Sequence, residues 1–414
     1  MKKFGLFVLK TLLMSIIIGV FIALYQYLAH LVIDGSSYLL EGKLFVCILT
    51  ICLALIGYAG LFYLNKHIPG YYGSGIPQIE AYHRGWYDFS GIKMLVLIII
   101  NSFYAFFTGF FLGSEGPSIS IGTSIGMISN KLFKDDDKML EACGGSAGFA
   151  CAFASPLAGL CHLIEENKML FGYKLILKGV LVIGLSFTIS YLIYPHSLLP
   201  YFDMSFLPLK YYYLVPIISL LSLASGKLYM YLIVKFKDIV KNKKIMNYLT
   251  PILIIVFMLV RRFVNDVSGA GGGLLSLDIF DYSLLILFII LVGRLIGTAI
   301  SVSSNTSGGV VLPMLAVGAI TADILIKIYS LIDSDITQYL GIFIICGMLV
   351  VFAVVTKSPL TALVLGLKCS KIEVIILPLL ISLVLSMIIV YLFKWENIYH
   401  KLEKRLKGYK EVHA

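Results

Sequence analysis

The 414-residue sequence contains little charge and no long polar segment. Aspartate, glutamate, lysine and arginine make up 14% of its residues, compared with about 25% in a soluble domain. Hydrophobic residues make up 59%, and the mean hydropathy is +0.94. A chain this apolar cannot cover its own surface in water, and no polar stretch is long enough to form a second domain.

Paired cysteines are also missing. None of the seven cysteines belongs to a CxxC pair, and most lie within or beside apolar runs, which is typical of small packing residues. Neither a disulfide framework nor a zinc site is indicated, and we predict no metal and no cofactor. The cysteines are Cys47, Cys52, Cys143, Cys151, Cys161, Cys346 and Cys369.

Long apolar runs are what the sequence has instead. Several reach the roughly 20 residues that span a bilayer, and the shorter ones suit helices that enter the membrane and stop. The first run outlasts the apolar core of a signal peptide, so we interpret it as a retained helix. We predict an all-α, polytopic membrane protein surrounded by lipid. The runs are Thr11–Val32, Leu44–Leu64, Met94–Leu112, Val180–Tyr194, Tyr213–Val234, Ile252–Val260, Leu284–Val302, Tyr339–Val355 and Val374–Phe393.

The net charge of +10 is concentrated in short stretches at the N-terminus, at 235–244 (KFKDIVKNKK) and at 401–410 (KLEKRLKGYK). The positive-inside rule places these stretches, and so both termini, in the cytoplasm. Nucleic-acid binding is the rival explanation of a basic chain. We discount it because no basic segment stands on a soluble domain.

Two short patterns return in the second half of the chain. SPLAG at 155–159 returns as SPLTA at 358–362, an offset of 203, and GPSISIG at 116–122 is echoed by LPMLAVG at 312–318, an offset of 196. We predict a single transmembrane domain, 1–400, built from two halves of about 1–205 and 206–400, with a short basic tail at 401–414. Paired halves are typical of transporters whose substrate site lies where broken helices meet. The patterns leave open whether the halves run parallel or inverted.

Three glycine-proline clusters interrupt the apolar sequence: GSGIP at 73–77, GSEGP at 113–117 and GGVVLP at 308–313. Proline suits the first turn of a helix, and glycine lets backbone amides approach a ligand closely. A helix N-terminus offers free N–H donors and the positive end of the helix dipole. Three such starts in one membrane chain predict an anion site.

These motifs resemble the three selectivity-filter motifs of the CLC chloride channel and transporter family, and the resemblance covers about residues 73–399. It implies the CLC fold of two repeated halves with broken and re-entrant helices, chloride as the bound substrate, and a homodimer with one pathway in each subunit. The regulatory domain pair of eukaryotic relatives has no room after Tyr399, which favours a prokaryotic plasma membrane. The filter residues are Gly73, Ser74, Gly75, Ile76, Pro77, Gly113, Ser114, Glu115, Gly116, Pro117, Gly309, Val310, Val311, Leu312 and Pro313.

The resemblance also assigns a central chloride site. In the family, a serine hydroxyl, a tyrosine hydroxyl and two backbone amides hold the ion. Here these groups match Ser74, the amides of Val310 and Val311, and Tyr399, with Tyr391 as the alternative tyrosine.

Two glutamates are candidates for proton movement. Glu115 is an ionisable side chain at a helix start inside apolar sequence, where charge is expensive and usually functional. The family uses the matching residue as both gate and proton carrier. Glu166 matches the glutamate that takes protons from the cytoplasm in proton-coupled members, and its presence favours a chloride/proton antiporter. Glu80 matches a buried glutamate that we interpret as structural.

Three residues depart from the family pattern. Ser114 replaces a lysine or arginine, Val311 replaces a phenylalanine, and Leu312 replaces a smaller residue. Fluoride-exporting relatives also depart in the second motif, but they generally alter the serine motif and lack the internal glutamate. Chloride is therefore the predicted substrate.

Other classes stay open as alternatives. A passive chloride channel shares every filter motif, and only Glu166 opposes it. An organic-solute carrier has the same paired halves but needs a larger cavity than glycine-lined helix starts suggest. His162, Glu165 and Glu166 share one helix face and could ligate a metal in a membrane enzyme. No second cluster of ligands appears in the sequence, and we predict that the protein is not an enzyme.

Overall fold

The computed structural model describes residues 2–68, 70–240, 243–304 and 306–406. Helices dominate these residues, and their only β pairing is two isolated bridges. Within the described ranges, nine helices are long and apolar enough to cross a membrane. The prediction of an all-α membrane protein is confirmed.

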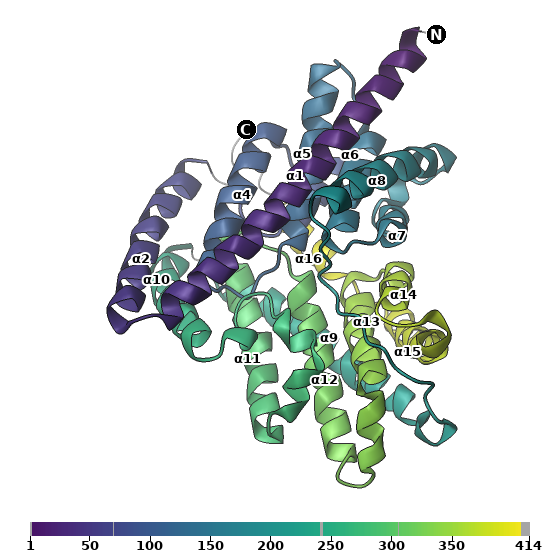
Figure 1. Cartoon of the computed structure of the whole chain (residues 1–414). Helices are drawn as coiled ribbons and strands as arrows, with labels where there is room; N and C mark the ends of the chain where they lie inside the picture. Colours follow the sequence, from purple (N-terminus) through teal and green to yellow (C-terminus); the bar gives the residue numbers. More distant parts are fainter. Residues whose placement is uncertain (1, 69, 241–242, 305, 407–414) are drawn as a thin grey trace.

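The first half of the chain forms eight α-helices and the second half forms another eight (Figure 1). The first eight are α1 (Lys2–Glu41), α2 (Leu44–His67), α3 (Ile76–His83), α4 (Gly91–Phe107), α5 (Glu115–Leu132), α6 (Lys138–Ala152), α7 (Pro156–Glu166) and α8 (Tyr173–Ile193). The others are α9 (Leu214–Ile239), α10 (Lys243–Phe263), α11 (Leu284–Ser303), α12 (Val311–Tyr329), α13 (Leu340–Thr356), α14 (Pro359–Lys368), α15 (Ile372–Leu392) and α16 (Ile398–Glu403).

Glycines at matching positions fix the closest helix crossing in each half. A methyl group on Gly122 of α5 would lie 2.0 Å from the carbonyl oxygen of Gly144 in α6. A methyl group on Gly318 of α12 would lie 2.3 Å from the carbonyl oxygen of Gly347 in α13. The first residues of these pairs are 196 apart and the second are 203 apart, the same offsets as the sequence echoes. The predicted repeat is therefore confirmed as a repeated packing unit.

Helices α5 and α12, which hold matching places in the repeat, run in opposite directions. Helices α5 and α12 meet at their N-termini, where the Val311 amide donates to the Glu115 carboxylate. From that meeting point they lie on opposite sides, α5 above and α12 below (Figure 1). This answers the question that the sequence left open. The approximate division at residue 205 stays a prediction, and the predicted tail includes residues 407–414, which lie outside the described residues.

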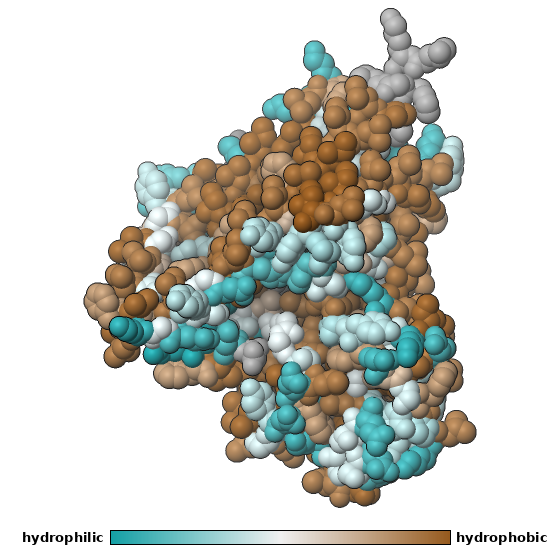
Figure 2. Space-filling view, in the orientation of Figure 1, coloured by the Kyte–Doolittle hydropathy of each residue, from teal (hydrophilic) through white to brown (hydrophobic). Residues whose placement is uncertain are grey.

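Apolar side chains cover the outside of the helix bundle. Burial reaches 94% over the most apolar window of Ser334–Thr356, which contains α13, and 83% over that of α12. It is only 28% over the corresponding windows of α2 and α8. The exposed residues of these outer helices are mainly large and apolar, as expected of a surface that faces lipid. Figure 2 shows this apolar surface, with polar residues gathered in a band across the face in view.

The glycine crossing generates a first prediction. Gly318→Ala places a methyl group against the α13 backbone, so it is expected to lower the free energy of unfolding by about 1–3 kcal/mol through overpacking. Gly60→Ala in α2 is the matched control, because its methyl group would meet nothing within 4 Å. Thermal unfolding of purified protein in detergent measures both. Equal melting temperatures for the two variants would contradict the assignment.

Candidate functional site

The backbone joins the three glycine-proline motifs at the centre of the molecule. The Gly73 amide donates to the carbonyl of Thr306 at 3.1 Å, and the Gly308 amide donates to the carbonyl of Gly73 at 3.2 Å. Gly113 and Gly309 exchange two hydrogen bonds, at 2.9 and 2.6 Å. Segments that are far apart in the sequence are therefore held side by side, just before the N-termini of α3, α5 and α12.

Glycine is required where these segments meet. A methyl group on Gly116 would lie 2.7 Å from the carbonyl oxygen of Ser74 and 2.9 Å from the Cα atom of Gly309. A methyl group on Gly113 or Gly309 would lie 2.0 or 2.2 Å from a carboxylate oxygen of Glu115. Only glycine lets the three backbones close around this carboxylate.

The Glu115 side chain is fully buried and lies on the N-terminus of α12. Its Oε1 atom accepts hydrogen bonds from the amides of Val311, at 2.7 Å, and Leu312, at 3.1 Å. Its Oε2 atom has no partner among the described residues. The free donors and dipole of a helix start stabilise a negative charge at this position. The Leu312 amide was not among the predicted donors.

Three of the predicted chloride ligands keep free donors. The Ser74 hydroxyl, the Val310 amide and the Tyr399 hydroxyl donate no hydrogen bond within the described part of the chain. The Tyr229 hydroxyl donates to the Val310 carbonyl at 2.9 Å and fixes that peptide. The fourth predicted ligand, the Val311 amide, is bound to Glu115 instead.

The two candidate tyrosines lie in different environments. Tyr399 is on α16 and is 2% exposed. Tyr391, at the end of α15, is 56% exposed and lines an apolar surface groove, with the Lys357 ammonium 5.3 Å from the centre of its ring. A ligand of a buried ion must itself be buried, so the geometry favours Tyr399.

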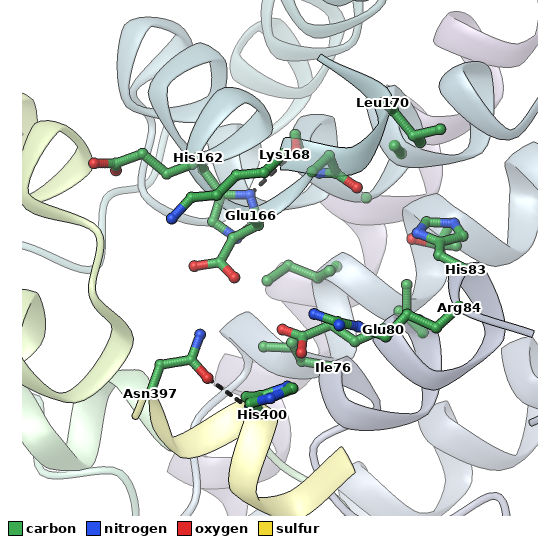
Figure 3. A pocket seen from close by; sticks show the side chains of 18 of the residues that line it. Ile76, Glu80, His83, Arg84, His162, Glu166, Lys168, Leu170, Asn397 and His400 are labelled. Atoms are coloured by element: carbon green, nitrogen blue, oxygen red, sulfur yellow. Dashed lines mark hydrogen bonds between the residues drawn. The ribbon is translucent and has the colours of Figure 1, made fainter. Parts of the chain in front are cut away.

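A cavity of about 450 Å³ contains Glu166, and we call it the Glu166 cavity. Figure 3 shows Glu166 of α7 and Glu80 of α3 directed into it, with Asn397, which precedes α16, and His400 of α16 on a third side. The Ser358 hydroxyl donates to the Glu166 carboxylate at 2.7 Å. The cavity also reaches Ile119 of α5, one turn beyond Glu115.

Glu80, which we predicted to be structural, faces a cavity rather than packed protein. It shares the Glu166 cavity, and its Oε1 atom has no partner among the described residues. The nearby Arg84 guanidinium pairs with Glu403 at 2.7 Å, and Glu403 also accepts from His400 at 3.0 Å. The cavity wall therefore combines several carboxylates with the basic side chains of Arg84, Lys168 and Lys357 and with three histidines.

The three side chains that could have ligated a metal together, His162, Glu165 and Glu166, each bind a different partner instead. His162 contacts the Ser146 hydroxyl at 3.1 Å, and Glu166 binds Ser358. Glu165 accepts hydrogen bonds from the amides of Leu360 and Thr361 and from the Thr361 hydroxyl, at 2.8, 2.9 and 2.6 Å. In the described ranges no group of three metal-ligating side chains occurs. Glu165 instead caps the N-terminus of α14, the repeat counterpart of its own helix.

The departures from the family pattern leave the surroundings of Glu115 neutral. The Ser114 hydroxyl donates to Gln26, and the Gln26 amide donates to the Ser118 hydroxyl, at 3.0 and 2.9 Å. Val311 and Leu312 are buried. The sequence did not reveal Gln26, which comes from the middle of α1.

The sequence did not predict a second cavity. It has a volume of about 450 Å³ and is lined by Gly113, Ser114 and Leu312 together with the loop 268–273. In the sequence, the run GAGGG at 269–273 could have indicated this loop, but unlike the three glycine-proline motifs it is not followed by a proline.

Comparison with known proteins agrees with this geometry. The family described as voltage gated chloride channel matches residues 59–391. This chain belongs to the voltage gated chloride channel family. The predicted family resemblance is therefore confirmed, and the protein is a multi-pass membrane protein.

Other members of the family align with most of the chain. A protein of Vibrio cholerae serotype O1, named H(+)/Cl(-) exchange transporter ClcA, is 28% identical over 418 residues, which cover 95% of this chain and 88% of the relative. The protein of the same name from Vibrio parahaemolyticus is 28% identical over 372 residues, covering 85% and 78%.

Solved structures share the fold. A slow cyanobacterial Cl-/H+ antiporter gives a TM-score of 0.86 at 22% identity and covers 97% of both chains. A CLC-type fluoride/proton antiporter gives 0.69 at 18% identity, covering 91% of this chain and 95% of the other. At this identity the similarity establishes the fold, and the CLC fold prediction is confirmed.

The cap on α14 generates a second prediction. Glu165→Ala removes the acceptor of two backbone amides and one hydroxyl, so it is expected to lower the free energy of unfolding by about 1–2 kcal/mol. The control is Glu373→Ala in the first turn of α15, where the side chain is exposed. Thermal unfolding in detergent compares them. A cap role is excluded if both variants melt at the same temperature.

Proposed function

We propose that the protein exchanges chloride for protons across the membrane, with Glu115 as the gate and Glu166 as the internal proton acceptor. The observation that carries the proposal is the position of the Glu115 carboxylate. It accepts hydrogen bonds from the amides of Val311 and Leu312, next along the chain from the free amide of Val310. The hydroxyls of Ser74 and Tyr399 likewise donate no hydrogen bond within the described residues. The relatives named H(+)/Cl(-) exchange transporter support the same activity.

The gate follows from the chemistry of these donors. Backbone amides suit any small anion, so a carboxylate and a chloride ion compete for them. When Glu115 gains a proton it loses its charge, its attraction to the amides weakens, and chloride can take the place of the carboxylate. One residue thus links proton binding to anion entry.

The Glu166 cavity provides an approach for the proton. A bare proton charge crossing apolar protein is costly, so carboxylates must shorten the distance it travels. Glu166 lies in a cavity that reaches α5 at Ile119, and Glu80 extends the acidic lining. Protons that enter from the cytoplasm would bind Glu166 first and reach Glu115 through α5 and its surroundings, without using the chloride ligands.

Two alternatives share the fold. A passive channel would not need Glu166, whose carboxylate is held at the cavity by Ser358. A fluoride exporter is the second alternative, because a fluoride/proton antiporter structure shares the fold. Against it, the serine motif at Ser74 and the internal glutamate, which fluoride-exporting relatives generally alter or lack, are both retained here. We further propose a homodimer in a prokaryotic plasma membrane with both termini in the cytoplasm, with chloride and protons as substrates and lipid around it.

Glu115→Gln tests the gate. The amide oxygen of glutamine can accept the same two hydrogen bonds but cannot carry a proton, so it resembles the protonated gate. Chloride flux is expected to continue while chloride-driven proton pumping falls to the background. Parallel chloride and proton fluxes from proteoliposomes measure this. Proton pumping at the parent rate would remove Glu115 from the mechanism.

Glu166→Gln tests the internal acceptor. The glutamine keeps an acceptor for Ser358, so the cavity wall should stay intact while the proton site is lost. We expect uncoupled chloride flux with proton pumping reduced at least tenfold, and anion binding unchanged.

The matched control is Glu165→Gln, which keeps an acceptor for α14 and should pump protons nearly as well as the parent. Equal loss in both variants would mean that charge at the helix end, rather than proton transfer, matters. A parent that never moves protons uphill would be a channel.

A further inference from the structure

The second cavity reaches the gate from a different direction than the Glu166 cavity, and the two share no lining residue. We call it the glycine-loop cavity. It touches Gly113 and Ser114, which precede Glu115, and Leu312, whose amide binds the Glu115 carboxylate. The cavity therefore adjoins the residues on either side of the Glu115 carboxylate.

Three carbonyl groups of the loop 267–271 accept hydrogen bonds from a buried guanidinium. Arg294 is fully buried and donates to the carbonyls of Val267, at 3.2 Å, Gly269, at 2.7 Å, and Ala270. A methyl group on Gly271 would lie 1.7 Å from the guanidinium, so only glycine permits this approach. The oxygen atoms that would repel an anion are therefore held by Arg294.

The amides of the same loop have no such partners. The four consecutive N–H groups of residues 270–273 donate to no acceptor in the described part of the chain, and all four residues line the cavity. Gly271 has φ +84° and Gly272 has φ −59°. When successive residues have φ angles of opposite sign, their N–H groups point toward the same concave side of the loop. This arrangement binds anions.

A second buried arginine adds positive charge to the cavity. Arg261 is 1% exposed yet lines it, and its Nε and Nη1 atoms are bound to Ser268, Ser36 and Phe106. Its Nη2 atom makes no hydrogen bond with the described residues. Within these residues no carboxylate pairs with either buried arginine. A buried charge without a fixed counterion attracts a mobile one.

The remaining ionisable lining groups do not cancel this charge. His30 and His196 stand together, with ring centres 4.1 Å apart, and His30 contacts the hydroxyl of Tyr194 at 2.8 Å. Asp34 is the acidic residue of the described lining, and it is exposed.

We propose that the amides of residues 270–273 and the Nη2 atom of Arg261 form a binding site for a small inorganic anion, where chloride rests before or after it passes Glu115. This loop site deepens the proposed function and rests on it for its role in transport. Amide donors with one set-back guanidinium would hold the ion loosely enough for release.

Gly272 offers a matched pair of variants. Its φ of −59° suits proline as well as alanine. A methyl group there would meet only Leu312, at 3.9 Å, which is ordinary contact. Gly272→Ala keeps the N–H group and Gly272→Pro removes it, and no hydrogen bond inside the protein is lost because this N–H has no acceptor. The preceding Gly271 has no side chain to clash with the proline ring.

The test is anomalous diffraction from bromide-soaked crystals of the parent and both variants. We expect bromide at the loop amides and Arg261 in the parent and in Gly272→Ala, and a lost or strongly reduced peak in Gly272→Pro. In reconstituted protein with equal chloride on both sides, Gly272→Pro should raise the half-saturating chloride concentration about tenfold, the size expected for one hydrogen bond to an ion. Gly272→Ala, which keeps the N–H group, should raise this concentration far less than Gly272→Pro does.

The outcomes separate this inference from the proposed function. No bromide at the loop of the parent, or an undiminished peak in Gly272→Pro, would overturn the site. An unchanged chloride dependence in Gly272→Pro would overturn its role in transport. If bromide binds at the loop of a parent protein that moves no chloride, the loop site is supported and the proposed antiport is refuted. If the parent is an active antiporter but binds no bromide at the loop, the antiport is supported and the loop site is refuted.

Discussion

The centre of this structure depends on bringing backbone N–H groups close to a negative charge inside an apolar interior. A side chain longer than hydrogen on Gly113, Gly116 or Gly309 would occupy the space that the Glu115 carboxylate or a neighbouring backbone now fills. The amides of Val311 and Leu312 can then reach that carboxylate. Helix starts supply donors that bind an anion without the strength of a full cation.

This constraint also explains the shape of the fold. Helices can point their N-termini at one central site from both sides only if they begin in the middle of the membrane protein and run outward in opposite directions. The inverted halves achieve this with α5 and α12. The crossings at Gly122 and Gly318 let α6 and α13 pack tightly against them, so the helix starts are held in place by backbone contact rather than by flexible side chains.

The sequence predicted the parts of the site that local chemistry determines. Proline and glycine mark helix starts, and an isolated glutamate among them is conspicuous, so the three motifs and Glu115 were accessible. Features that depend on contacts between residues far apart in the sequence could not be predicted. The choice between Tyr399 and Tyr391 needed the burial of α16, and the role of Glu165 needed the position of α14. The glycines at 269–273 stand out in the sequence. Their contact with Arg294, 25 residues beyond Gly269, could not be predicted from it.

The distribution of charge around Glu115 has a consequence for how the gate can work. A cation at position 114 would pair with the carboxylate and help to hold it on the amides, whereas Ser114 joins a neutral chain with Gln26. The buried positive charges, Arg261 and Arg294, instead lie at the loop beside the gate and are bound there to carbonyl and hydroxyl oxygens. The positive charge therefore lies along the cavity that leads to the carboxylate rather than in direct contact with it. Release of Glu115 then requires breaking hydrogen bonds to two amides rather than a direct ion pair, which suits the gating role that we propose for this residue.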